Sequence, residues 1–292
     1  MKRWSQQEID FLNKNYSQNG TAFCSENLNR DRKSVQKKAS KLKLYVEKEV
    51  IKNLRSSTVK ESWNKRTDSE NNLSKILKIP LENFTGNENS LYFMGYLWGD
   101  GSIIHKGVGR ENSLRLEIVK EDALDIFDKM NSLINWNIYT RKRTGRREMM
   151  SFTITNRILT EHFLTLGYGQ KSLIAPKFLE DIPIPKRRHF YMGLSDADGC
   201  WYFNKKNKCY QYTISSTFDQ DWKHITDLFD HLEIKYSIRR RKQNRKDLST
   251  TKSSSVVVSN RNDVIKLGEY LYTDCFIGLR RKHEKYLHFK IN

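Results

Sequence analysis

The sequence predicts an α+β protein with two pseudo-symmetric halves, each ordered αββαββα, after a small all-α N-terminal domain. An internal repeat predicts the two halves. Asp100 and Asp198 stand 98 residues apart in two nearly equivalent stretches, and a basic triplet recurs at the same offset. Landmarks that return in the same order along one chain indicate a duplication. The paired landmarks are 93–101 with 191–199, 141–143 with 239–241, and 153–157 with 257–261, the last at an offset of 104.

The first 45 residues predict three short helices with apolar residues at helical spacing. Ser5 and Glu8 fit a capping box, Gly20 predicts a turn, and Ser34 is expected to cap the third helix. The arrangement resembles the helix-turn-helix or Myb-like modules at the N-terminus of some phage-encoded nucleases. That resemblance implies DNA binding, and a small helical cap with a solvated charged face is the alternative. The basic residues expected on the outer face of the third helix are Lys37, Lys38 and Lys41.

The segment 46–85 is polar and irregular, and we interpret it as a linker that is partly helical over 46–60. The first half is then expected to occupy residues 86–185 and the second half residues 186–292. These boundaries place each repeated motif near the start of its own half.

The two repeated motifs predict a pair of closely packed helices that end in acids. Small residues four apart lie on one helix face, so two such helices can approach until their backbones nearly touch. Asp100 and Asp198 fall at the helix C-termini, where the macrodipole disfavours negative charge. Two acids at this end of two adjacent helices predict a cation between them. The small residues expected at the helix interface are Gly95, Gly99, Gly193 and Ala197.

Each half continues with apolar and polar residues that alternate with period two, which predicts half-buried strands. Four antiparallel strands with helices on one face leave the other face open, and here that face is rich in basic and polar residues. Two such sheets would form a basic saddle. The expected elements are strands 114–118, 138–143 and 150–155 with helices 123–133 and 158–166 in the first half, and strands 210–215, 236–242 and 255–259 with helices 222–232 and 263–272 in the second.

The formal net charge is +19, which predicts a polyanionic partner: nucleic acid first, an acidic membrane surface second. No apolar stretch approaches the ~18 residues of a membrane span, so no segment is expected to cross a membrane, and of the two partners we expect nucleic acid and no membrane. The four cysteines form no Cys-x-x-Cys pair, and the N-terminus lacks the apolar core of a signal peptide. We therefore expect reduced thiols and a location in the cytoplasm, or inside a host cell or organelle, rather than secretion.

The two motifs, each opening an αββαββα unit, resemble those of LAGLIDADG homing endonucleases in their two-motif, single-chain form. The stretch 191–199 is a close match, whereas 93–101 departs at Trp98, where an acid is usual. The resemblance spans about 200 residues. It implies a monomer that binds double-stranded DNA, takes part in intron homing, and uses Mg²⁺ to hydrolyse one phosphodiester on each strand of a long, pseudo-palindromic or asymmetric site.

The resemblance also implies roles for individual residues. Asp100 and Asp198 correspond to the metal-binding acids, and the carbonyls of Gly99 and Ala197 would complete oxygen ligation suited to Mg²⁺. The family places a basic residue near the scissile phosphate after each closing helix. The residues that fit this catalytic role are Lys171 in the first half and Lys282 in the second, with Arg281 as the alternative to Lys282.

The basic strands are expected to supply DNA binding. Arginine is the commonest side chain to read guanine in the major groove, and alternation allows only one parity of each strand to face DNA. Arg141, Arg143, Arg239 and Arg241 share that parity. Arg115 and Gln211 lie on the polar faces of neighbouring strands. Residues expected at hairpin tips, against phosphates, are Arg146, Arg147, Arg245 and Lys246.

A second function class stays open on the same fold: a non-cleaving nucleic-acid-binding protein, either a transcription regulator or an intron-splicing maturase. Regulators built on this fold have lost the metal acids, and both acids stand in this chain, which favours the enzyme. Maturase activity is compatible with intact acids, so the sequence leaves it as the alternative.

Overall fold

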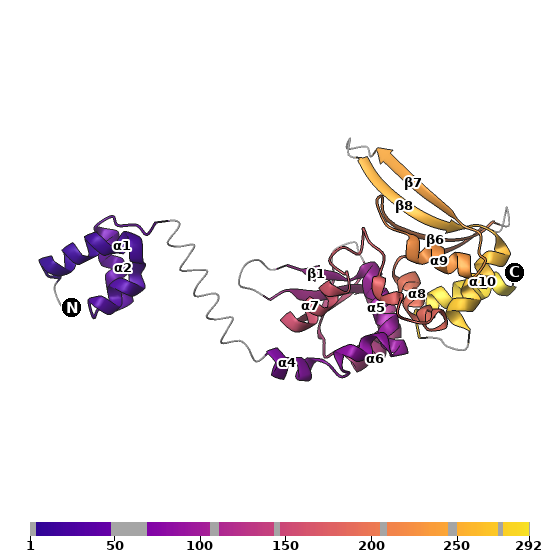
Figure 1. Cartoon of the computed structure of the whole chain (residues 1–292), viewed down its shortest axis with the longest axis horizontal. Helices are drawn as coiled ribbons and strands as arrows, with labels where there is room; N and C mark the ends of the chain where they lie inside the picture. The colour runs from indigo at the N-terminus through magenta and orange to yellow at the C-terminus, as the bar shows by residue number, and fades with distance from the viewer. Residues whose placement is uncertain are drawn as a thin grey trace. The chain divides into compact units, whose positions relative to one another are not determined.

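The protein is described from a computed structural model that covers residues 4–47, 69–105, 111–142, 147–204, 209–244, 250–273 and 277–291. The chain divides into a smaller unit drawn from Met1–Asp68 and a larger unit formed by Ser69–Lys106 and Glu111–Asn292 (Figure 1). Each unit has a hydrophobic core of its own. Within the described ranges, no helix is both long and apolar enough to cross a membrane.

The smaller unit consists of α1 (Gln6–Asn27) and α2 (Arg32–Lys41). The predicted capping box is present, because Ser5 and Glu8 each bond the other's backbone N–H through their side chains. Gly20, at φ 74°, breaks α1 into two helical segments, so the three expected helices are confirmed. Their buried contacts include Leu12 and Val35, both fully buried.

The cap predicted at Ser34 is wrong. The Asp31 carboxylate accepts hydrogen bonds from the backbone N–H groups of Lys33 at 3.0 Å and Ser34 at 3.2 Å. Asp and Ser are both favourable N-caps, and the helix begins at the earlier one because Arg32 and Lys33 extend it at little cost in helix propensity.

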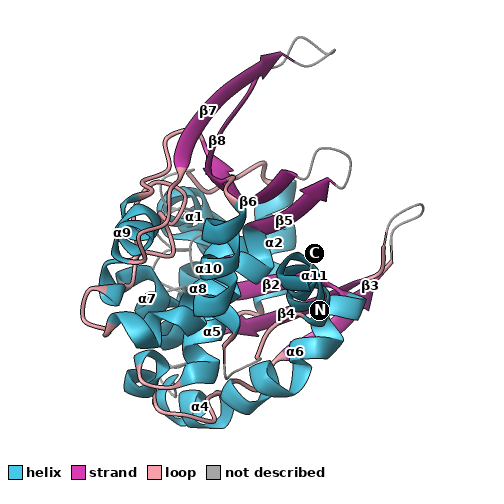
Figure 2. Cartoon of the chain, turned by 90° about the vertical axis from the view of Figure 1, so that its right-hand side faces the viewer, coloured by secondary structure: helices cyan, strands magenta, loops and turns pink. Residues whose placement is uncertain are grey.

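The larger unit contains the two expected αββαββα halves, in which the helices cover one face of each sheet (Figure 2). Both sheets are antiparallel, with strand orders β1-β2-β4-β3 and β5-β6-β8-β7. The first half comprises α5 (Glu88–Asp100), β1 (Ser102–Ile104), β2 (Ser113–Val119), α6 (Lys120–Leu133), β3 (Asn137–Arg141), β4 (Met149–Thr155) and α7 (Arg157–Thr165); the second comprises α8 (Ile184–Asp198), β5 (Gly199–Asn204), β6 (Cys209–Thr217), α9 (Lys223–His231), β7 (Ser237–Asn244), β8 (Thr250–Val258) and α10 (Arg261–Tyr272).

Two elements of the second half differ from the sequence expectation. The strand expected over 255–259 begins at Thr250, because its polar start pairs with the long strand β7 and the hairpin projects from the body of the unit (Figures 1 and 2). A further helix, α11 (Arg280–Ile291), follows α10. Its Tyr286 and Phe289 rings lie 5.8 and 6.0 Å from the Trp201 ring, on the covered face of the second sheet.

The predicted linker 46–85 extends too far toward the C-terminus. The helix α4 (Ser69–Ile76) and the 3₁₀ helix η1 (Leu81–Thr85) belong to the larger unit. Phe84 is fully buried there, and the Lys78 N–H donates to the Leu133 carbonyl at 2.9 Å. The apolar residues that pack against the core of the larger unit are spaced through this polar segment; they are Leu73, Ile76, Leu77, Ile79, Leu81 and Phe84. The helical stretch expected over 46–60 lies almost wholly outside the described residues.

The helices α5 and α8 form the centre of the larger unit and join its two halves. A Cβ built on Gly95 would lie 1.8 Å from the Phe190 carbonyl oxygen, and one built on Gly193 would lie 2.0 Å from the Tyr92 carbonyl oxygen. The two backbones are therefore in direct contact, and no side chain fits at either glycine. A second 3₁₀ helix, η2 (Lys177–Leu179), lies on the connection between the halves.

Candidate active site

The close packing of α5 and α8 brings their C-terminal ends together. Asp100 is the last residue of α5 and Asp198 the last of α8. A Cβ built on Gly99 would lie 2.5 Å from the Cβ of Ala197 and 3.0 Å from Oδ2 of Asp198. The two predicted acids thus end neighbouring helices, on the same side of the seam.

Both carboxylates reach solvent on one side, while the surrounding protein replaces part of their hydration. This loss of hydration raises the pKa of Asp100, and it raises the pKa of Asp198 to about 6, with the charge of Asp100 as the second cause. Two carboxylates that disfavour each other's charge are stabilised by a cation placed between them.

Lys171 lies on the segment after α7 and reaches the end of α5. Its Nζ donates to the carbonyl oxygen of Leu97 at 3.0 Å and to that of Gly99. Burial lowers the pKa of Lys171 to about 8, although Asp198 and Asp100 oppose the shift. The ammonium therefore sits beside both acids, against the carbonyls that the macrodipole makes negative.

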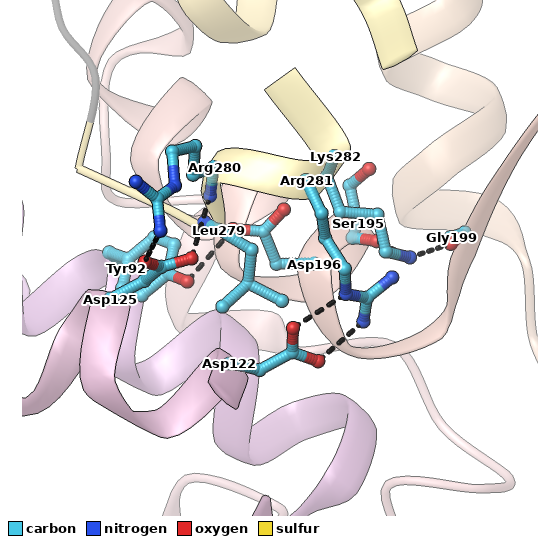
Figure 3. A network of polar contacts seen from close by, with 10 residues as sticks. All are labelled: Tyr92, Asp122, Asp125, Ser195, Asp196, Gly199, Leu279, Arg280, Arg281 and Lys282. Carbon is cyan, nitrogen blue, oxygen red and sulfur yellow. Dashed lines mark hydrogen bonds and ion pairs between the residues drawn. The ribbon is translucent and has the colours of Figure 1, made fainter. Parts of the chain in front are cut away.

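Lys282 occupies the corresponding place at the end of α8 (Figure 3). It is only 6% exposed, and its Nζ donates to the carbonyl oxygens of Ser195, at 3.3 Å, and Gly199. Burial, followed by the charge of Arg281, lowers its pKa. The Arg281 guanidinium instead binds Asp122 on α6. Of the two candidates in this half, Lys282 is the one beside α8.

The donor chemistry at the two helix ends suits a hard divalent cation, since carboxylate and carbonyl oxygens are the ligands that Mg²⁺ prefers. Asp100 and Asp198 are the residues that would hold it. Among the described residues there is no cluster of three or more His, Cys, Asp or Glu with metal-binding geometry, so water or substrate oxygens would complete the shell. The Gly99 carbonyl accepts a bond from Lys171 and could serve as a ligand only once released.

A cavity of about 200 Å³ opens beside Asp198 and Lys171. Trp98 lines it from α5, and Ser216 and Gln220 line it from the second half. Of the two acids, Asp198 lines this cavity.

Asp196 is a buried acid next to the site, and the sequence motif alone assigns it no role. The Tyr92 hydroxyl donates to its Oδ2 at 2.8 Å and the Leu279 N–H at 2.7 Å (Figure 3), while Oδ1 has no partner within the described part of the chain. Burial raises its pKa to about 7. The first acid of the 196–198 pair was the signal that could have indicated it. No sequence pattern points to Asp122, whose partner lies in the other half.

The open face of the first sheet carries a cluster of opposite charges. Arg115 Nη2 contacts Glu117 Oε1, and Arg141 Nη1 lies 3.6 Å from the same oxygen. The carboxylate of Glu117 therefore offsets part of the positive charge of the two arginines that were predicted to contact DNA.

The open face of the second sheet is free of such a cluster within the described residues. Arg239 and Arg241 are exposed on one face of β7, whereas the Nε of Arg240, between them, donates to the Phe218 carbonyl at 3.4 Å. Gln211 on β6 bonds Thr213 at 2.7 Å.

The register of the paired strands shows that the basic triplets 141–143 and 239–241 do not start in equivalent cross-strand rows of the two sheets. Tyr139 lies opposite Ser151, which lies opposite Glu117. The matching row of the second sheet runs from Arg239 through Ser255 to Ser215. The structural counterpart of Arg141 is therefore Arg241, two residues beyond the one that the 98-residue offset indicates.

The remaining predicted DNA contacts are placed as follows. Arg147 is exposed just before β4. In the smaller unit Lys37 and Lys41 are exposed on α2, whereas Lys38 Nζ lies 6.0 Å from the centre of the Trp4 ring. Four predicted contacts lie outside the described residues: Arg143, Arg146, Arg245 and Lys246.

No protein-family model matches the chain, and no curated protein matches it. Similar solved structures include the LAGLIDADG homing endonuclease I-GzeII in complex with its DNA target, at 11% identity and a TM-score of 0.43 over 70% of this chain and 89% of that one. The LAGLIDADG meganuclease I-AabMI bound to uncleaved DNA is similar at 13% identity and a TM-score of 0.44, over 70% and 89%. I-SmaMI, bound to uncleaved DNA with calcium, is similar at 12% and 0.42, over 70% and 90%.

Proposed function

We propose that this chain is a metal-dependent endonuclease of the LAGLIDADG type that cuts both strands of a DNA duplex. One observation carries the proposal: Asp100 and Asp198 end two helices in backbone contact, and each helix end has its own half-buried or buried lysine. Two equivalent sets of groups around one axis suit two phosphodiesters on the antiparallel strands of a duplex.

The chain's own residues have separable roles in this chemistry. Asp100 and Asp198 would hold Mg²⁺, which when bound stabilises the charge of an in-line phosphodiester displacement. Lys171 and Lys282 keep a positive charge fixed beside the acids, where negative charge develops on the phosphate oxygens. Burial lowers the pKa of Lys171 to about 8, so its positive charge is present below that pH and is lost as the pH rises above it.

The net charge of +19 and the open sheet faces support duplex DNA as the substrate, since neutralising phosphates dominates affinity for nucleic acid. Both sets of groups stand in one chain, so the proposed enzyme acts as a monomer on a pseudo-palindromic or asymmetric site. We also propose that residues 1–45 are an accessory DNA-binding module. Deleting them should shorten the footprint and weaken binding while metal-dependent cutting persists.

The deciding experiment incubates the full chain with a library of duplexes and Mg²⁺, beside Asp100→Asn, Asp198→Asn and the double variant. We expect site-specific double-strand cuts that disappear with a chelator and in the double variant, while binding to the selected duplex is kept. Asp128→Asn, an exposed position on α6, is the matched control and should cut normally. Tight binding without cutting of any duplex would contradict the nuclease and favour the regulator or maturase.

A further inference from the structure

The segment 277–282, which leads into α11 and includes its first residues, belongs to the second half but is bound by the first (Figure 3). From α6, Lys129 Nζ donates to the Ile277 carbonyl at 2.7 Å, and Asp125 accepts from the Arg280 N–H at 3.1 Å. From α8, Asp196 accepts from the Leu279 N–H at 2.7 Å. The approach of α11 to the site is thus fixed by helices of both halves.

The strongest of these contacts is the ion pair between Arg281 and Asp122. The guanidinium donates through Nε and Nη2 to the two carboxylate oxygens, each at 2.6 Å, and Asp122 is only 7% exposed. A bidentate pair fixes orientation as well as distance. Successive helix residues point about 100° apart, so with Arg281 held on α6, Lys282 is turned toward the end of α8.

The first half shows the reciprocal arrangement with weaker contacts. Residues 172–174, directly after Lys171, are bound by the second half: the Thr217 hydroxyl donates to the Ser172 carbonyl at 2.5 Å, and the Asp221 N–H donates to the Leu173 carbonyl at 3.2 Å. Each candidate catalytic lysine therefore stands on a segment that is anchored to the opposite half. Among the described residues, the segment that carries Lys282 is the one anchored by an ion pair, in which the Asp122 carboxylate is buried and the Arg281 side chain is 45% exposed.

We propose that Asp122 and Arg281 are positioning residues, through which the first half places Lys282 at the metal-binding end of the second half. In this role the ion pair sets where the ammonium of Lys282 stands. The expected consequence is that the cut on one DNA strand depends on a contact between the two halves. This consequence rests on the proposed nuclease function.

The test follows the two strands separately, using the duplex selected from the library with a different label on each strand. Lys282→Met identifies the strand that Lys282 serves. We expect Asp122→Asn and Arg281→Lys to slow the cut on that same strand by about 10- to 100-fold, the loss typical of a misplaced catalytic group, while the other strand changes less than about twofold. If the same site is carried on a plasmid, the variants should accumulate the nicked form, in which one strand is cut and the other is intact.

A double-mutant cycle separates positioning from general damage. If Asp122 acts through Lys282, adding Asp122→Asn to Lys282→Met should cause no further loss on that strand. Asp128→Asn, which makes the same charge change on the same helix, should leave both strands unaffected. Equal slowing of both strands, or additive losses in the double variant, would overturn the proposal.

A measurement that needs no cleavage keeps this inference separate from the proposed function. Lys282 is nearly inaccessible, so an amine-reactive reagent followed by mass spectrometry should label it slowly in the intact chain. We expect at least about tenfold faster labelling in Asp122→Asn, an opening free energy lowered by roughly 1.4 kcal/mol, and no change in Asp128→Asn. Unchanged labelling in a folded Asp122→Asn variant would overturn the positioning role, whereas absent cleavage by the intact chain would contradict the nuclease alone.

Discussion

The two sheets have the same strand order but present different charges on their open faces. One row reads Tyr139, Ser151 and Glu117 in the first sheet, and the matching row reads Arg239, Ser255 and Ser215 in the second. In the first sheet a carboxylate, Glu117, therefore lies among the arginines. At the equivalent positions of the second sheet, Arg239 stands in place of Tyr139 and Ser215 in place of Glu117. Duplication preserved the backbone of the site while the surfaces expected to read DNA diverged.

The largest effect is expected where the halves are still alike, at the seam. Gly95→Ala and Gly193→Ala each force a methyl group to within about 2 Å of a backbone oxygen, so both should destabilise the larger unit by about 3 kcal/mol or more. Urea unfolding measures the loss. Gly86→Ala is the control, because its Cβ would meet only the Asn83 oxygen at 3.8 Å. A large loss at one glycine alone would show that the seam is not symmetric.

The next effect should separate the two sheets. Arg239→Gln and Arg241→Gln each remove an exposed arginine and should weaken DNA binding by about tenfold or more. Arg141→Gln should weaken it by less than about threefold, because Glu117 already offsets its charge. Titrations at several salt concentrations measure both the affinity and its salt slope. Equal losses of DNA affinity in Arg141→Gln and in the two β7 variants would show that Glu117 does not offset the charge of Arg141.

A smaller effect of opposite sign is expected at Glu117. Glu117→Gln frees Arg115 and Arg141 from their shared carboxylate, so overall DNA affinity should rise by roughly two- to fivefold. Discrimination between related duplexes should fall, since a carboxylate can accept a bond from cytosine but repels phosphate. Glu161→Gln breaks an exposed pair with Arg157 on α7 and is the matched control. Weaker binding by Glu117→Gln would contradict the offset.

The smallest effect concerns the acids. The pKa of Asp198 is about 6 in the folded chain and 3.8 as its ordinary value. The folded form therefore loses stability as pH rises from about 4 to 6, and the cost is fully present at pH 7. Without metal, Asp198→Asn should raise Tm by about 2–4 °C at pH 7 and leave it unchanged near pH 3. A lower Tm at pH 7 would contradict the raised pKa.

Much of this architecture could be predicted because it depends on local pattern. The repeat, the acids at helix ends and the parity that separates Arg239 and Arg241 from Arg240 follow from spacing along the chain. Alternation shows which face a residue takes, but it does not show which row it occupies. The two-residue shift between the basic triplets was therefore invisible until the strands were paired.

Other features were out of reach because they join distant residues. Asp122 and Arg281 are 159 positions apart, and nothing near either one marks it as half of a pair. The burial of Phe84 was missed for a related reason: the polar composition of 69–85 hides the few apolar residues that pack against the larger core. The extra helix α11 likewise depends on the aromatic surface of a sheet far from it in sequence.

The unequal hairpins bear on the shape of the target. β7 and β8 contain 8 and 9 residues, against 5 and 7 in β3 and β4. The whole hairpin 237–258 is three residues longer than 137–155; shared between its two arms, these add about 5 Å of reach, which spans roughly one to two base pairs along a duplex. The bound site should then be lopsided, with a longer protected arm on one side of the cuts. Its two flanks would drift at different rates in evolution, because the longer arm tolerates fewer base changes.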